Sequence, residues 1–412
     1  MKQTIPLLFL FAFFIVSCDT TDDIPTPNPP VSNIDCDETP EACNVTKSNN
    51  AFGFKLFQTL HNDTPDENIF ISPMSVATAL SMTVNGAKGQ TKADMMATLE
   101  QNNISLEAVN DGFLQLLNLL PALDPEVELN LANSIWYRDG FQVRQEFLTA
   151  NEEHYDSEVA SLNFADPAAR ETINAWVDDK TQGLIESIVD EPISSDVVMY
   201  LINAIFFKGA WLHEFDPEHT YATQFRLEDG STTEVDMMTY NQTLLNYFET
   251  ENFQAVDLPY GDSIYTMSLF LPKQDASIDD IIASLNNDNW AQWSESYFYQ
   301  DMYFGMPRFE MEYDESLVKA LSSMGMSIAF GGGCDLTGIA DADLVIDEVK
   351  HKAFIEVNEE GTEAAAVTSV VIIETSVPQI PSMYLNRPFI FTIRENQSNN
   401  VLFMGKMMNP NG

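Results

Sequence analysis

The chain of 412 residues is strongly acidic, with 63 Asp and Glu against 19 Lys and Arg and a formal net charge of −44. Nucleic acids and heparin-like polyanions are bound by clustered cations, and no Lys or Arg occurs between residues 93 and 137. These two classes of partner are therefore excluded. Hydrophobic residues make up 45% of the chain, which is enough for a sizeable core. We expect the acidity to serve solubility in an extracellular setting.

Residues 1–17 have the pattern of a signal peptide. Lys2 supplies the positive end, and an unbroken apolar run from Leu7 to Val16 is too short to span a bilayer as a stable helix. The ending Ile-Val-Ser-Cys, at residues 15–18, resembles a bacterial lipobox, in which Cys18 would be lipidated. An ordinary secretory signal with a chance Cys is the alternative. We expect a lipid anchor without a transmembrane helix, in the cell envelope, at the outer membrane or cell surface and facing outwards.

Residues 18–47 are predicted to form a flexible tether, because Asp, Thr, Pro and Asn dominate them. Cys36 and Cys43 are close enough in this stretch to form a disulfide outside the cytoplasm, although spacing alone does not establish the required geometry. Cys334 would then be a free thiol. No CxxC or HExxH spacing occurs, so we expect neither a metal site nor a cofactor.

The folded pattern begins near Ser48 with apolar residues at helical spacing. Ser72 is a suitable N-cap and Pro73 a suitable first residue for a second helix, which Gly86 would end. Strand patterns follow at residues 129–137, 197–207, 255–259, 265–272, 306–310 and 345–357, and the apolar run at 197–207 is typical of a strand buried on both faces. No repeat or linker divides residues 48–412, so we expect one domain.

Residues 359–377 combine two patterns. The first part carries Gly361 and small side chains, which suit a hinge, and the second part is β-branched and apolar, which suits a buried strand. The even positions from 362 to 372 are Thr, Ala, Ala, Thr, Val and Ile, and a period of two would place them on one face of a sheet. Pro378 and Pro381 instead favour an extended connection. The segment can therefore be a loop in one state and a strand in another.

The run Glu-Glu-Gly-Thr-Glu-Ala-Ala-Ala at residues 359–366 resembles the hinge of a serpin reactive-centre loop. Residues 386–391 and 402–410 resemble the closing strands of the same family, and the resemblance extends over nearly all of residues 48–412. It implies an α+β serpin fold with a large, mostly antiparallel central sheet A, two further sheets, about eight to nine helices and an exposed loop near the C-terminus.

The resemblance also implies a function, which is the suicide inhibition of extracellular serine endopeptidases. The loop would be cut, the protease would be trapped as a covalent acyl complex, and residues 361–374 would insert into sheet A. No charge or Pro occurs between Ala364 and Ile373, which favours an inhibitor over a non-inhibitory serpin acting as a binding module. A non-inhibitory serpin that acts as a binding module is the alternative function. The implied hinge residues are Glu359, Gly361, Thr362, Glu363, Ala364, Ala365, Ala366 and Thr368. A monomer is expected.

The reactive bond is predicted between Thr375 and Ser376 by counting from the hinge. Counting back from Arg387 and Pro388 instead places the reactive bond immediately before Pro378. Proteases cleave a bond before proline poorly, so we reject this second position. Cleavage after Glu374 or Ile373 stays open. The small and aliphatic residues favour elastase-like or subtilisin-like proteases, whereas Glu374 would suit a glutamyl endopeptidase. Cysteine proteases are a further open class of target.

Other residues match positions that control sheet opening in the family. Ser72 and Ser75 match the serines of the "shutter", where strands must part, and His351 matches its histidine, which is expected to bond to Asn203. Trp211 falls at the "breach", where the loop first enters. Arg308 and Glu359 match an ion pair at the breach, and residues 173–185 resemble the helix that crosses the front of sheet A.

A catalytic role is not expected. The five His have no recognisable catalytic context, and the chain contains neither a G-x-S-x-G elbow nor a phosphate-binding loop. A lipid-anchored hydrolase is therefore the weakest of the three functional interpretations.

Overall fold

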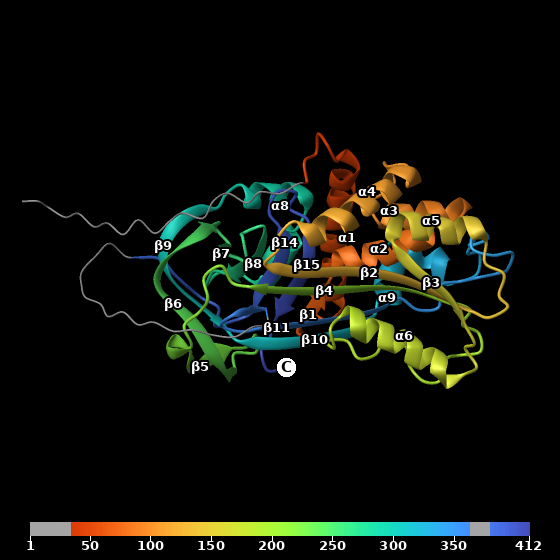
Figure 1. Cartoon of the computed structure of the whole chain (residues 1–412). Helices are drawn as coiled ribbons and strands as arrows, with labels where there is room; N and C mark the ends of the chain where they lie inside the picture. The colour runs from red at the N-terminus through yellow and green to blue at the C-terminus, as the bar shows by residue number, and fades with distance from the viewer. Residues whose placement is uncertain (1–33, 363–379) are drawn as a thin grey trace, which may run out of the picture.

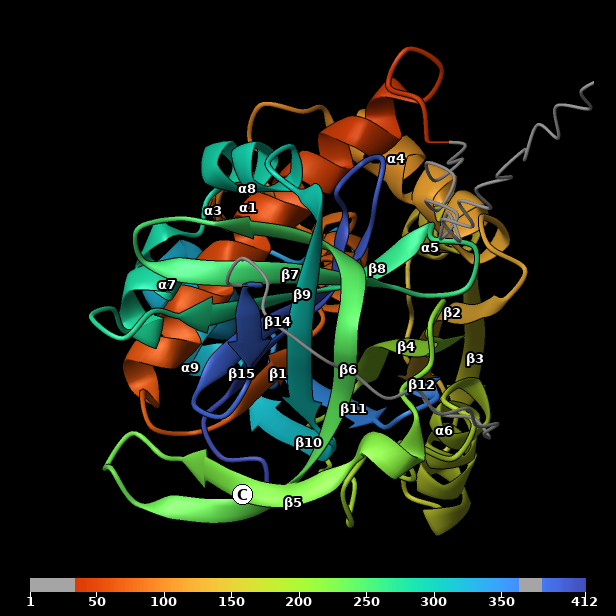
Figure 2. The ribbon, with the colours of Figure 1, turned by 90° about the vertical axis from the view of Figure 1, so that its left-hand side faces the viewer.

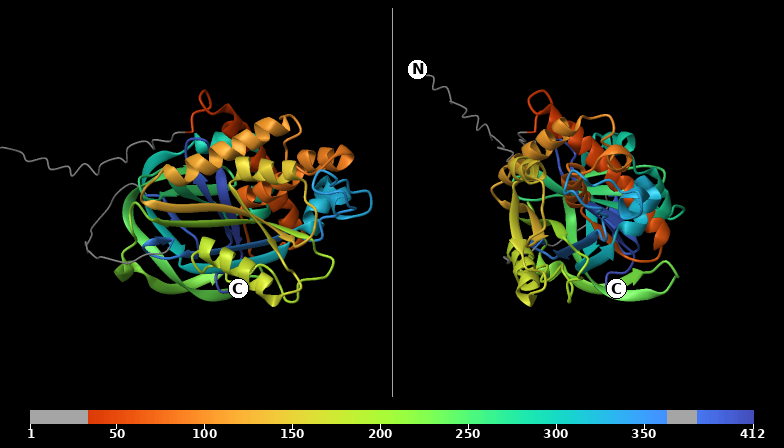
Figure 3. Two further views of the ribbon diagram at one scale, coloured as in Figure 1. Left: turned by 45° about the vertical axis from the view of Figure 1, so that its right-hand side comes forward. Right: turned by 90° about the vertical axis from the view of Figure 1, so that its right-hand side faces the viewer.

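The computed structural model describes residues 34–362 and 380–412. Most helices gather on one side of the molecule, and α6 lies apart from them, below β2 and β4 in the view of Figure 1 (Figures 1 and 3). The helices are α1 (Pro40–Asp63), α2 (Pro73–Val84), α3 (Gly89–Thr98), α4 (Leu106–Leu119), α5 (Gln145–Tyr155), α6 (Pro167–Lys180), α7 (Ile278–Ser284), α8 (Asn287–Ser294) and α9 (Val318–Leu321). The mixture of helices and sheets is the expected α+β architecture.

The first helix begins earlier than predicted. α1 starts at Pro40, which occupies the first turn together with Glu41, and a disulfide joins Cys36 to Cys43. Ile34 and Cys43 are buried. The predicted boundary at residue 48 therefore lies inside this helix. The signal was present in the sequence, because Pro and an acidic residue both favour a helix N-terminus.

The largest sheet has nine strands and faces the viewer in Figure 2. Its order is β1 (Ile69–Ile71), β15 (Val401–Met407), β14 (Phe389–Glu395), β8 (Tyr265–Pro272), β7 (Phe253–Pro259), β6 (Thr232–Glu249), β9 (Phe298–Pro307) and β13 (Ser382–Tyr384), with β5 (Tyr221–Arg226) also paired to β6. The two further sheets that were expected are joined into this one sheet. β6 and β9 are paired along both parts of it, and their register shifts between Tyr240 and Thr243.

The closing strands expected from the family resemblance are present as β14 and β15. Every residue of both strands is buried, and they pair antiparallel with Phe391 opposite Gly405. A Cβ at Gly405 would lie 2.2 Å from the Phe391 ring, so only glycine allows the two strands to approach this closely.

The remaining strands form two smaller groups. One has the order β12 (Gly361–Thr362), β4 (Met199–Ala210), β2 (Val127–Arg138) and β3 (Ser157–Leu162), and the other pairs β10 (Phe309–Ser316) with β11 (Lys350–Val357). The predicted strand at 306–310 is interrupted at Arg308, and the one at 345–357 becomes a hydrogen-bonded strand only at Lys350. The large central sheet expected from the sequence is therefore present in two parts.

Alternate residues of β4 face two separate cores, as a period of two requires. Ile205 and Phe207 belong to the main core, which α1 and α2 cover. Ile202 and Ala204 belong to a smaller core under α6, together with Trp176. The helix that crosses the front of the sheet is thus confirmed, although it spans residues 167–180 and begins before the predicted residue 173.

Candidate functional site

The candidate site is a cleft between β4 and β11. Among the described residues no hydrogen-bonded ladder joins these two strands, and a cavity of about 370 Å³ lies between them. Residues 196–205 form one wall, and residues 343–352 form the other. One face of the buried helix α2 closes the cavity with Ser75, Val76, Ala79, Leu80 and Thr83. The cleft is largely apolar, and β-strand backbone flanks it on both sides.

One end of the cleft already holds two residues of the predicted hinge. Gly361 pairs with Ala210 and Thr362 pairs with Gly209, in an antiparallel ladder on β4. Gly361 has a φ of +150°, and a Cβ there would lie 2.3 Å from the Gly209 carbonyl oxygen. Glycine is therefore required where the chain turns into the cleft.

Trp211 organises the entrance to the cleft. Its backbone N–H donates to the Glu360 carbonyl at 2.9 Å, and its indole Nε1–H donates to the Asn358 carbonyl at 3.0 Å. The two bonds join the end of β4 to the turn that follows β11. The position predicted for Trp211 is therefore the place where the hinge meets the sheet.

Arg308 and Glu359 form the ion pair that the sequence suggested. Arg308 Nη2 lies 2.6 Å from both carboxylate oxygens of Glu359, so one nitrogen makes both contacts, and Thr220 Oγ1 donates to the same carboxylate at 2.6 Å. Glu359 is buried, which by itself opposes ionisation. The hydrogen bonds from Arg308 and Thr220 outweigh burial and hold the pKa of this carboxyl below its usual value.

His351 and Asn203 both line the cavity, but the hydrogen bond predicted between them is not formed. His351 Nε2 instead accepts from the backbone N–H of Ser72 at 3.1 Å, and Asn203 Nδ2 donates to Asn133 Oδ1 at 2.8 Å. Asn203 is thus bonded within its own half of the divided sheet, whereas His351 is bonded to the N-cap of α2. Asn203 Oδ1 is buried and accepts no hydrogen bond, so the wall of the cleft offers an unused acceptor.

The predicted cap at Ser72 is confirmed. Ser72 Oγ accepts from the Ser75 backbone N–H at 3.1 Å and begins α2. The same residue thus starts the helix that lines the cleft and donates its N–H to His351 on β11. Burial lowers the pKa of His351 to about 4, so its ring is neutral near pH 7 and Nε2 is free to accept that bond.

An ion pair at the other end of the cleft was not predicted from the sequence. Lys350 on β11 contacts Asp190 at 2.8 Å, and Asp190 lies in the segment between α6 and β4. A second pair, Lys352 with Asp314 at 2.6 Å, stays on the β10–β11 side. The Asp190–Lys350 pair therefore bridges the two halves of the sheet, and no local pattern relates residues so far apart in the chain.

Several predicted residues lie outside the described residues. These are the lipidation site Cys18, the later hinge residues Glu363, Ala364, Ala365, Ala366 and Thr368, and the candidate reactive-bond residues Ile373, Glu374, Thr375 and Ser376. Within the described part of the chain, no group of His, Cys, Asp and Glu is arranged to hold a metal ion. None of the helices described there is long and apolar enough to span a bilayer.

Comparison with known proteins identifies the family. A model of the family described as "Serpin (serine protease inhibitor)" matches residues 47–410. The chain belongs to the serpin family. Serpins are protease inhibitors rather than catalysts, and their partners are serine proteases.

Relatives and solved structures of this serpin extend over most of its length. Iripin-1 of the tick Ixodes ricinus is 32% identical, with 99% of each chain covered, and the leukocyte elastase inhibitor of the pig Sus scrofa is 32% identical, with 89% of this chain and 99% of the relative covered. The native structure of the thermophilic serpin tengpin superposes with a TM-score of 0.81 at 32% identity, covering 93% of this chain and 97% of tengpin.

Proposed function

We propose that this serpin is a suicide-substrate inhibitor of extracellular serine endopeptidases, and that residues 361–374 insert between β4 and β11 once the loop is cut. The divided sheet carries the proposal. At one end of the cleft β12 already pairs with β4, and beyond it the two strands are separated by a cavity where a further strand has room.

The register of β12 indicates where an inserting strand would lie. If the pairing of Thr362 with Gly209 continues along β4, Ala366 falls opposite Ile205, Thr368 opposite Asn203 and Ile372 opposite Met199. The last of these pairs reaches the far end of β4. Thr368 would then stand beside the unused acceptor Asn203 Oδ1. Small and β-branched side chains suit a strand buried between two others.

Insertion would supply the free energy that traps the protease. A new central strand satisfies a row of backbone donors and acceptors on two neighbouring strands at about 1 kcal/mol net each, on the order of ten to twenty kcal/mol in total. This is comparable with the whole stability of a typical domain, roughly 5–15 kcal/mol. Such a gain is large enough to distort the active site of an attached enzyme before the acyl bond is hydrolysed.

The target class follows from the loop residues. The favoured bond, Thr375–Ser376, and its alternatives after Glu374 or Ile373 contain no Arg or Lys, which disfavours trypsin-like enzymes. We propose elastase-like or subtilisin-like proteases as targets, with a glutamyl endopeptidase as the variant that Glu374 would suit. Leukocyte elastase inhibitors among the relatives support the first choice.

A denaturing gel tests the proposal. The protein is mixed separately with an elastase-like, a glutamyl-specific and a trypsin-like protease, and the released C-terminal peptide is weighed by mass spectrometry. We expect a boiling-resistant band at the summed mass with the first or second enzyme, and the peptide mass then identifies the reactive bond. Clean cleavage in all three mixtures, with no rise in the melting temperature of the clipped protein, would instead support the alternative, a non-inhibitory binding module.

A hinge variant separates inhibition from simple cleavage. Ala364→Pro removes a backbone N–H that the inserted strand needs, so we expect the variant to be cut at the normal rate without forming the covalent band. Ala364→Ser is the matched control, because it keeps both the N–H and a small side chain. An undiminished covalent band in the proline variant would contradict strand insertion.

We further propose that Cys18 carries a lipid that holds the inhibitor at the outer membrane or cell surface. Its support is the apolar run followed by Ile-Val-Ser-Cys at residues 15–18. Antibody labelling of intact cells tests the proposal, with Cys18→Ala as the unanchored control. Labelling of the parent protein only after lysis would count against surface display.

A further inference from the structure

Tyr260 lies against Thr362 of β12, at the head of the cleft. It follows β7, forms an isolated bridge with Trp211, and is fully buried. Its ring stacks on that of Trp211 at a centroid distance of 4.4 Å and meets Phe207 edge-on at 5.0 Å. A Cβ at Gly209 would lie 3.1 Å from the ring, so the glycine on β4 leaves room for it. Three residues at the end of β4 thus hold the ring in one place.

The Tyr260 hydroxyl has a specific partner in the hinge. Its oxygen lies 3.0 Å from Thr362 Oγ1, and the side chain of Thr362 is itself buried. Burial raises the pKa of Tyr260, so the hydroxyl is neutral and can donate or accept at any physiological pH. Leaving either hydroxyl without a partner in this dry site is unfavourable, so the two groups favour each other's position.

We propose that Tyr260 is a positioning residue for inhibition, which holds Thr362 in the register that the rest of the loop follows when it inserts. This inference rests on the function proposed above. A new strand is costly to start, because several residues must be ordered before their hydrogen bonds form. The Tyr260–Thr362 bond keeps the first pairs on β4 in place before the protease arrives. Insertion then extends an existing strand.

The consequence is kinetic. After the loop is cut, insertion competes with hydrolysis of the acyl bond, and the ratio of the two rates sets how many inhibitor molecules are consumed for each protease trapped. Removing one hydrogen bond of ordinary net strength slows insertion roughly two- to tenfold relative to hydrolysis. The first cleavage is unaffected, because the scissile bond lies far along the chain from Thr362.

The test measures the stoichiometry of inhibition with a protease that forms the covalent complex with the parent protein. Tyr260→Phe keeps the stacked ring and removes the hydroxyl, and Thr362→Val keeps the shape and removes the partner. We expect the number of inhibitor molecules consumed beyond one per trapped protease to rise roughly two- to tenfold in each variant. The double variant should be no worse than either single one, since both remove the same bond. Thr362→Ser, which keeps the hydroxyl, should behave like the parent.

Several outcomes would overturn the inference. A lower melting temperature with unchanged stoichiometry in both single variants would mean that the bond is only structural. Additive effects in the double variant would mean that the two hydroxyls act separately. If the parent chain forms no complex with any protease, the proposed function fails first and this inference falls with it. If the parent forms the covalent complex and the variants have the same stoichiometry of inhibition as the parent, the positioning role is overturned and the proposed function is not.

Discussion

His351 contributes a pH-dependent term to the stability of the protein. Its pKa is about 4 in the folded chain, because the ring is buried, against 6.5 in an exposed site. Below pH 6.5 the unfolded chain takes up a proton that the folded chain does not, so the free energy of unfolding falls as the pH decreases towards 4. The full loss over this window is on the order of 3 kcal/mol, and it stops growing below pH 4.

Replacing His351 by Gln tests this term. The amide oxygen of Gln can accept the Ser72 N–H but does not titrate, so we expect a smaller loss of stability between pH 6.5 and 4 than in the parent protein. Chemical denaturation at each pH measures the difference. His219→Gln, at a partly exposed site, is the control. Parallel curves for the parent and His351→Gln would contradict the assignment.

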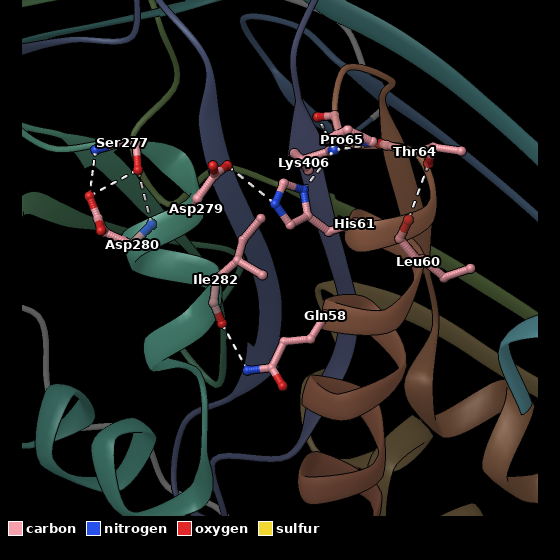
Figure 4. Close-up of polar contacts among 10 residues, drawn as sticks. All are labelled: Gln58, Leu60, His61, Thr64, Pro65, Ser277, Asp279, Asp280, Ile282 and Lys406. Carbon is pink, nitrogen blue, oxygen red and sulfur yellow. Dashed lines mark hydrogen bonds and ion pairs between the residues drawn. The ribbon is translucent and has the colours of Figure 1, made fainter. Parts of the chain in front are cut away.

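Lys406 is a second buried titratable residue, in the closing strand β15 (Figure 4). Its Nζ donates to the carbonyls of Thr64 at 3.0 Å and Pro65 at 2.7 Å, and lies 3.1 Å from His61 Nδ1. His61 Nε2 in turn contacts Asp279 at 3.2 Å. Burial lowers the pKa of Lys406 to about 8, although nearby carboxylates, that of Asp279 first, favour its charged form.

The contribution of Lys406 to the free energy of unfolding increases with pH, which is opposite to the usual loss of stability at alkaline pH. Between pH 8 and 10.5 the unfolded lysine keeps its proton and the folded one releases it, so this residue makes the free energy of unfolding rise with pH. We expect the difference in stability between the parent and Lys406→Met to shift in favour of the parent over this range. A difference that does not change with pH would show that Lys406 has an ordinary pKa.

At the scale of elements, the two halves of the sheet are held by few direct links. At one end β12 and the hydrogen bonds of Trp211 join them, and at the other end the Asp190–Lys350 pair links β11 to the segment that precedes β4. Between these links lies the cavity. Opening the cleft therefore requires the breaking of a small number of polar contacts, whereas the ladders within each half can stay intact.

The Asp190–Lys350 pair is expected to slow spontaneous opening. Asp190 is 81% exposed, so the pair contributes little, about 0.2–1 kcal/mol, and Asp190→Asn should speed loss of inhibitory activity on warm storage by at most a few-fold. Asp314→Asn is the matched control, because its ion pairs stay within β10 and β11. Equal storage lifetimes in the two variants at low salt would contradict a role across the cleft.

At the scale of the whole molecule, the net charge of −44 opposes the compact state. Salt screens this repulsion over a Debye length of about 10 Å at 0.1 M. We expect the melting temperature to rise steeply as NaCl increases from a few millimolar to about 0.2 M and then to level off. A melting temperature that is flat below 0.2 M would show that the acidic side chains are too well dispersed to repel one another.

The sequence by itself determined the local features of this protein. Ser72 caps a helix through its own side chain, and the apolar run at residues 197–207 marks a strand, because caps and periodicities depend on neighbouring residues. The family resemblance added the Arg308–Glu359 pair, which the structure contains. The start of α1 at Pro40 could also have been predicted from the sequence, but the polar composition of the surrounding residues favoured a flexible tether.

The tertiary structure alone decided how distant segments meet. That β4 and β11 are separated by a cavity, that His351 bonds to Ser72 and not to Asn203, and that Tyr260 contacts Thr362 all depend on register between strands far apart in sequence. A histidine or tyrosine can satisfy its polar atom with any of several partners at similar free energy. The packing of the strands around each side chain selects one of them, and that selection leaves no pattern in the chain.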